Sequence, residues 1–326
     1  MRKGWEYKKL GDCTQILDSQ RKPVTKRDRK SGIYPYYGAT GIQDYVDKYI
    51  FDGRYVLVGE DGAKWSSFTQ SAFIIEGKTW VNNHAHVLRT NDFLVDSFLV
   101  YFLNYSDLDS YISGAIIRKL TQASLRNIDI PLPPKSTQLA IVSELDKINE
   151  LIRLKKEQLK DFDNLAQSLF YEMFGDPVEN EKGWEVKKLG EICEIFAGGD
   201  KPKDMCEIQN NEYIYPVIAN GEGEKGILGY TKNCRVTKEA VTIGARGASI
   251  GNCRIVKNGF TPAIRLLTLI PTGSIDCCFL YYFVKDLNYK QNGAGQAQLT
   301  VPNIKCEFIP LPPLPLQRLF AQGGVI

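Results

Sequence analysis

The chain has 326 residues, of which 43% are hydrophobic and 24% charged, and its formal net charge at pH 7 is +3. At roughly 150 residues per domain, this length indicates two domains, and the composition is that of an ordinary globular protein. The sequence contains no run of 18 apolar residues, and its opening, MRKGWEYKKLGD, has no apolar signal segment. We therefore expect a cytoplasmic protein without a membrane partner.

A basic segment, RKPVTKRDRK, occupies residues 21–30. Lysine and arginine in a proline-containing loop suit phosphate contacts, but a solvated surface loop has the same composition. The net charge of the whole chain is too small to decide between the two interpretations.

The next segments predict a mixed fold. IYPYYGATGIQDYVDKYIFDGRYVLVGEDG consists of short β-rich runs broken by Gly and Asp, and DSFLVYFLNYSDLDSYI has apolar residues at helical spacing. We therefore expect an α+β fold. Tyr36, Tyr37 and Trp65 in this region could pack on the sugars of a nucleic acid or belong to the core.

The sequence gives little indication of a metal site. The two histidines, His84 and His86, alternate in NNHAH, so they could share one strand face and form a metal pair. No cysteine lies in the neighbouring sequence, and none of the eight cysteines forms a CxxC pair. We expect reduced structural thiols, no bound metal and no cofactor.

The second half repeats the borders of the first. GWEYKKLGDCTQI at 4–16 recurs as GWEVKKLGEICEI at 183–195, and IPLPP occurs at 130–134 and again at 309–313. Gln138 has its counterpart in Gln317. Inside these borders the similarity is weaker, as in VLVGEDGA and VTIGARGA. We predict two copies of one domain with diverged interiors, at 1–136 and 180–315.

A long helix is predicted between the copies, at 137–175, where the sequence from Thr137 to Phe174 contains no Gly or Pro. Leu151, Leu154, Leu165 and Phe170 widen its apolar stripe, which is interrupted by Lys155. At 1.5 Å per residue, about 37 residues would form a rod of roughly 55 Å. A coiled-coil spacer and a helix packed on its own domain both explain the stripe, and we favour the spacer. The seam positions are Ile141, Leu145, Ile148, Ile152, Leu159, Phe162, Leu169 and Met173.

The IPLPP phrase precedes this helix. Proline fixes φ and disfavours helix in the residue before it, so the phrase should be extended and direct the chain into the helix. A polyproline ligand for a signalling domain is the alternative interpretation.

Taken in order, these motifs resemble the specificity (S) subunit of type I restriction–modification enzymes. The resemblance is carried by the two GWE segments, by GARGASIG, and by LTQASLRNIDIPLPPKSTQLAIVSELDKI and LTVPNIKCEFIPLPPLPLQRLF. It implies two target recognition domains that each read half of a split double-stranded DNA site, and two antiparallel helices that separate them. It also implies docking of methyltransferase (M) subunits and, through the complex, of the restriction (R) subunit, with no catalysis by the S subunit itself.

The sequence departs from this pattern after Gln317, where 316–326 form a short tail in place of a second long helix. We expect the first helix to lack a partner within the chain. It would then pair with the same helix of another copy, with M helices, or with a half-length S chain.

No motif for methyl transfer, nuclease activity or nucleotide hydrolysis is present, and GEDGAKW only superficially resembles a metal-dependent nuclease. The alternative to a DNA reader is a two-lobed protein-binding scaffold. Candidate DNA contacts are side chains able to reach phosphates or base edges. They are Arg21, Lys22, Lys26, Arg27, Lys64, Asn82, Asn83, Arg118, Lys119, Lys201, Lys203, Asn220, Lys225, Arg246 and Gln296.

Overall fold

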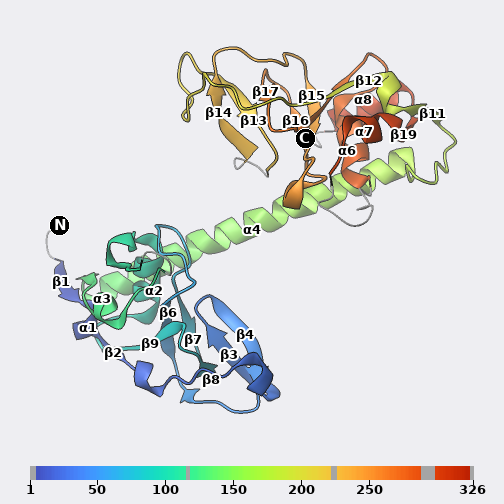
Figure 1. Ribbon diagram of the computed structural model, residues 1–326. Coiled ribbons are helices and arrows are strands. Elements are labelled where there is room, and N and C mark those ends of the chain that lie inside the picture. The colour runs from blue at the N-terminus through green and yellow to red at the C-terminus, as the bar shows by residue number, and fades with distance from the viewer. Residues whose placement is uncertain (1–4, 115–117, 222–225, 288–297, 324–326) are drawn as a thin grey trace. The chain divides into compact units, whose positions relative to one another are not determined.

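The computed structural model describes residues 5–114, 118–221, 226–287 and 298–323 (Figure 1). It divides into two compact units, Met1–Leu154 and Lys155–Ile326. Each unit has its own hydrophobic core and combines helices with small sheets, which confirms the α+β expectation. None of the helices within the described ranges is long and apolar enough to cross a membrane.

Unit 1 is built mostly from short strands. The strands are β1 (Glu6–Lys9), β2 (Thr14–Ile16), β3 (Ser31–Gly38), β4 (Gly41–Val46), β5 (Phe51–Asp52), β6 (Tyr55–Gly59), β7 (Ala72–Ile75), β8 (Lys78–Val81), β9 (Ala85–Thr90) and β10 (Asp129–Leu132). The helices are α1 (Leu10–Cys13), η1 (Asp18–Gln20), η2 (Lys26–Asp28), α2 (Asp96–Tyr105), η3 (Asp109–Tyr111) and α3 (Gln122–Arg126). The sheets have the orders β2-β9-β6-β7, β4-β3-β8-β5 and β1-β10.

Strand β6 lies in the core of unit 1, and all five of its residues are buried. A strand buried on both faces reads as a continuous apolar run, which is the pattern of YVLVG. Phe98, Leu99 and Leu103 of α2 point toward this sheet from one helical face and are buried. Trp65 and Tyr36 are also buried, and the Trp65 indole nitrogen donates to the Gly59 carbonyl oxygen. These two aromatic rings therefore belong to the interior.

Unit 2 repeats this plan. The strands are β11 (Glu185–Lys188), β12 (Cys193–Ala197), β13 (Tyr215–Ile218), β14 (Ile227–Thr231), β15 (Ala240–Ile243), β16 (Cys253–Val256), β17 (Thr261–Pro262), β18 (Leu267–Pro271) and β19 (Phe308–Leu311). The helices are α5 (Leu189–Ile192), η5 (Gly247–Ser249), α6 (Cys277–Asp286), α7 (Val301–Cys306) and α8 (Leu314–Gln322). The sheets have the orders β12-β18-β15-β16, β14-β13-β17 and β11-β19.

The repeated IPLPP phrase forms strands β10 and β19. Strand β10 pairs antiparallel with β1, and β19 pairs antiparallel with β11; β1 and β11 begin in the two GWE segments. Ile130 and Ile309 are fully buried in these pairs. The phrase is extended and leads into a helix, as expected, but it is paired in a sheet and is not a free spacer. The start and end of each repeat are therefore one structural feature, which is why the two motifs recur together.

A buried glutamine fixes the chain after each phrase. The Gln138 side chain accepts from the Val95 amide at 2.9 Å and donates to the Pro133 carbonyl oxygen at 2.9 Å. In unit 2, Gln317 accepts from the Asp276 amide at 2.8 Å and donates to the Pro312 carbonyl oxygen at 2.7 Å. Each glutamine thus satisfies a donor at the start of the helix that covers the core, α2 or α6.

The long helix α4 occupies Lys135–Phe174. Ile141 packs against the core of unit 1, and Leu169 and Met173 pack against the core of unit 2. The expectation that Phe170 widens an outer stripe is wrong, because its ring is 1% exposed and stacks on Phe279.

The middle of α4 exposes the rest of the apolar seam. Ile148, Ile152, Leu159 and Phe162 are 51%, 46%, 64% and 57% exposed, and Leu151, Leu154 and Leu165 are exposed as well. The packed-helix interpretation therefore holds for the two ends of α4, whereas the middle presents an apolar surface to solvent.

Candidate nucleic-acid interface

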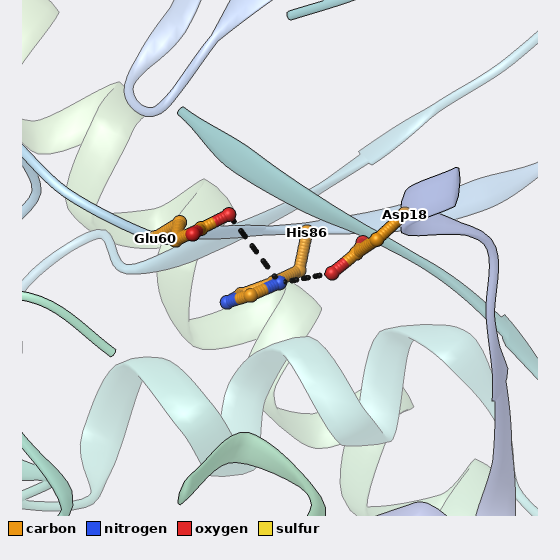
Figure 2. A group of neighbouring side chains, drawn as sticks. All are labelled: Asp18, Glu60 and His86. Atoms are coloured by element: carbon orange, nitrogen blue, oxygen red, sulfur yellow. Dashed lines mark hydrogen bonds and ion pairs between the residues drawn. The ribbon is translucent and has the colours of Figure 1, made fainter. Parts of the chain in front are cut away.

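A buried polar cluster of Asp18, Glu60 and His86 lies where β2 and β6 end and β9 begins (Figure 2). The His86 Nδ1 is 2.6 Å from Asp18 Oδ2 and 3.8 Å from Glu60 Oε2, and its Nε2 is 2.8 Å from the Leu120 carbonyl oxygen. A carbonyl oxygen and an ionised carboxylate only accept, so this geometry favours an imidazole ring in which both nitrogens donate.

Two further cations complete the cluster. Arg21 lies 2.6 Å from Glu60 and 3.3 Å from Asp18, and Lys119 lies 2.7 Å from Glu60. Burial alone would raise the pKa of Asp18, but the hydrogen bond and charge of His86 hold that pKa below its ordinary value. Burial also opposes ionisation of Glu60, and hydrogen bonds from Lys119 and Arg21 lower the pKa of Glu60.

The cluster has the residue types of a metal site, because its imidazole and two carboxylates converge. Its carboxylate oxygens are already bonded by Arg21, Lys119 and His86, and these cations supply the charge that a metal would supply. We therefore assign it to an internal ionic network. His84 does not join His86 in a metal pair, because its Nδ1 binds Asp61 at 2.5 Å.

Several sequence-predicted DNA contacts are engaged inside the protein. Arg21 also donates to the carbonyl oxygens of Asn83 and Ala85, and its side chain is 13% exposed. Asn82 is buried and donates to Gln43. These bonds hold the two side chains in the fold of unit 1, so neither is retained as a DNA contact.

Two more candidates act in the same internal way. Asn220 accepts from the Ala245 amide at 2.8 Å and donates to the Ile264 carbonyl oxygen at 2.8 Å, which fixes two loops of unit 2. Lys119 binds the ionic network through Glu60, although its side chain is 41% exposed. Asn220 is withdrawn from the DNA-contact set because both of its polar atoms are bonded, whereas Lys119 remains a candidate because its side chain is partly exposed.

The other described candidates are exposed at the surface. Lys64 and Arg118 line a hollow of about 430 Å³ in unit 1, where Arg118 also pairs with Asp109 at 2.8 Å. Lys225 and Gln296 lie outside the described residues. The exposed set is Lys22, Lys26, Arg27, Lys64, Asn83, Arg118, Lys201, Lys203 and Arg246.

The exposed candidates include Arg246, whose contact with Gln298 was missed by the sequence analysis. The Arg246 Nη2 donates to Gln298 Oε1 at 3.1 Å, across an isolated β-bridge. In unit 1 the bridge at the equivalent place joins Asp61 and Lys119. In the sequence, the alignment of VLVGEDGA with VTIGARGA places Asp61 and Arg246 at the same position of the two repeats. This alignment was the sequence signal that could have identified the turn.

Comparison with known families decides between a DNA reader and a protein scaffold. The family described as type I restriction modification DNA specificity domain matches residues 2–161 and 181–323, one range in each repeat. The chain belongs to this family. Its role is DNA sequence recognition without catalysis of its own, and the scaffold alternative is not favoured.

Individual relatives support the same assignment. A type I specificity subunit of Mycoplasma pneumoniae is 29% identical over 94% of this chain and 85% of its own length. A type I restriction enzyme specificity subunit of Haemophilus influenzae is 41% identical over 45% of this chain and 38% of its own length. The crystal structure of the type I S subunit from M. genitalium has the same fold, with a TM-score of 0.60, 16% identity and coverage of 98% of this chain and 90% of that one.

Proposed function

We propose that each unit reads one half of a bipartite double-stranded DNA site. The observation that carries this proposal is the duplication itself: both family matches coincide with a complete frame of paired GWE and IPLPP strands and a buried glutamine. Two similar readers with diverged interiors are suited to two related but different half-sites. We propose the functional boundaries 1–136 and 180–315 for the readers, 137–175 for the spacer and 316–326 for the tail.

Loops with exposed cations supply the contacts to the DNA backbone in this proposal. Lys22 follows η1, Lys26 and Arg27 lie in the short helical turn η2, and Lys201 and Lys203 lie in the loop that follows strand β12, the equivalent of β2. Lysine and arginine at such positions bind phosphates and set the register of a protein on the duplex. Arg246 is retained for a base edge, because a guanidinium group can make two parallel hydrogen bonds.

The exposed middle of α4 is a helix-docking surface in this proposal. An apolar stripe on a helix is stable in water only when another apolar surface covers it. The partner is a helix of the M subunit, the same helix of a second copy, or a half-length specificity chain, and the R subunit joins through the resulting complex. Because these partners act on chromosomal DNA, we propose a cytoplasmic location.

The test is co-production of the chain with its M subunit, followed by mapping of methylated bases in the host DNA. A split motif with different halves is expected from two readers in one chain. A symmetric, inverted motif would instead indicate that two chains each contribute one reader. No methylation, while another specificity subunit is active with the same M subunit, would contradict the proposal.

A measurement of salt dependence separates DNA reading from a scaffold role. A complex that releases counterions from about six phosphate contacts should lose affinity steeply, with a slope of log K against log salt near −5. Replacement of Lys26 and Arg27 by alanine should reduce that slope by about two. A slope near zero for the assembled complex would favour the protein-binding scaffold.

A further inference from the structure

The turn after β6 in unit 1 and the turn after β15 in unit 2 occupy the same place in the two repeats. Val58 pairs with His86 in one sheet, and Ile243 pairs with Leu267 in the other. Three residues further along, Asp61 forms a bridge with Lys119 and Arg246 forms a bridge with Gln298.

The backbone contacts of the two turns agree as well. The Leu120 amide donates to the Glu60 carbonyl oxygen at 2.8 Å, and the Leu299 amide donates to the Ala245 carbonyl oxygen at 3.0 Å. The glycine that follows the bridged residue has a positive φ in both turns, +69° at Gly62 and +59° at Gly247. Asp61 and Arg246 are therefore equivalent positions that carry side chains of opposite charge.

The chemistry at the two turns differs accordingly. In unit 1, Asp61 receives His84 on Oδ1, and its second carboxylate oxygen is a further acceptor. In unit 2, one guanidinium nitrogen of Arg246 donates to Gln298, and both side chains lie at the exposed surface. One turn presents an acceptor and the other presents a set of donors.

Two consecutive residues shortly before β18 have left-handed backbone conformations, and the equivalent residues before β9 do not. Ile264 and Arg265 have φ values of +50° and +60°, which are unfavourable for side chains with a Cβ and above all for a β-branched isoleucine. Arg265 lies two residues before Leu267, as His84 lies two residues before His86. The acidic Asp61 of unit 1 is thus replaced by the basic Arg246 in unit 2, and the residue two positions before the paired strand residue changes from histidine to arginine.

We propose that Asp61 and Arg246 are equivalent base-reading positions that make the two half-sites differ. Arg246, oriented by Gln298, reads the O6 and N7 acceptors of a guanine in the major groove, and Asp61 accepts from the N4 amino group of a cytosine. The inference rests on the proposed function, because it assigns a base to each of the two readers.

The experiment uses the chain assembled with its M subunit and a DNA library in which each base of the mapped site is varied in turn. The variants are Arg246→Ala, Arg246→Lys, Asp61→Ala and Asp61→Asn. The matched controls are Lys257→Ala and Asp92→Ala, which remove exposed charges of the same sign elsewhere in the same units. Thermal melting of each variant confirms that it is folded, and the conservative variants carry the test if an alanine variant is not.

Both Arg246 variants should reduce discrimination at one guanine by roughly 10- to 100-fold and leave the other half-site unchanged. Both Asp61 variants should do the same at one cytosine of the opposite half-site, while the controls keep the full motif. Weaker methylation of all sequences with an unchanged motif would make Arg246 a phosphate contact and overturn the inference, as would an unchanged rate and motif. If the wild-type chain itself methylates nothing, the proposed function fails first, and that result is distinct from a failure of these variants.

Discussion

The ionic network of unit 1 has an apolar counterpart in unit 2, and this gives a quantitative prediction. The strand registers place Leu267 at the position of His86, and the alignment of the two GWE segments, continued by two residues, places Ala197 at the position of Asp18. Asp18→Ala and His86→Leu therefore copy residues that the same frame already accommodates. Asp18 is the centre of the network, since it receives His86, Arg21 and the Val87 amide.

Asp18→Ala should destabilise unit 1 by about 3–5 kcal/mol, because it leaves buried donors without their acceptor. For a unit of this size, that corresponds to a decrease in melting temperature of roughly 6–20 °C. In the double variant, His86→Leu also removes the imidazole whose carboxylate partner was deleted by Asp18→Ala. The double variant should therefore be more stable than the sum of the two single changes predicts, by about 1–3 kcal/mol.

The assay is hydrogen exchange of the full chain, measured on peptides that cover β6 and β9, because a two-unit protein need not unfold in one step. Peptides from β15 and β18 of unit 2 serve as the internal control and should not change. Additivity of the two single changes within about 0.5 kcal/mol would refute the reasoning, because the two side chains would then not be coupled.

Three further outcomes are expected. The pKa values of Asp18 and Glu60 lie below their ordinary values in the folded protein. Their contribution to the stability of unit 1 is therefore present above the ordinary carboxyl pKa and is lost as the pH falls through their pKa values in the folded state. Asp286 in unit 2 has a raised pKa because it is buried, and this favours folding on acidification, so hydrogen exchange at pH 3–5 should show unit 1 opening first. Phe170→Ala should destabilise unit 2 by about 3–5 kcal/mol in the same assay, whereas Phe162→Ala should preserve folding and weaken assembly in sedimentation. Gln138→Leu should destabilise unit 1 by about 1–3 kcal/mol because the Val95 amide loses its acceptor, which thermal melting would detect.

The sequence predicted the frame of each repeat because the frame consists of local signals. The GWE and IPLPP motifs, the helix without Gly or Pro and the α+β pattern are all visible within short windows. It could not show that IPLPP pairs with GWE, since that contact joins residues more than a hundred positions apart. The recurrence of both motifs together in each repeat was a clue to their pairing. However, a strand and a free extended spacer have the same sequence pattern.

The candidate site was predicted less well, because charge in a sequence does not reveal whether a side chain is paired. Arg21 and Lys22 are neighbours in the same basic segment, yet Arg21 is held by two carboxylates and Lys22 is exposed. Phe170 and Phe162 lie on the same helix, and only the structure shows that one is core and the other surface. In both cases the deciding factor is a tertiary contact outside the local pattern.

The two repeats together show which parts of the fold are free to change. The register of β6 on β9 equals that of β15 on β18, the bridge beside each turn is equivalent, and the glutamine contacts agree, so these features define what the backbone needs. The interior beside the turn is ionic in unit 1 and apolar in unit 2, and the turn itself carries Asp61 in one and Arg246 in the other. Because this backbone accommodates either an ionic or an apolar interior, the residue on the turn can be exchanged without loss of the fold. A change of the recognised base then requires few substitutions.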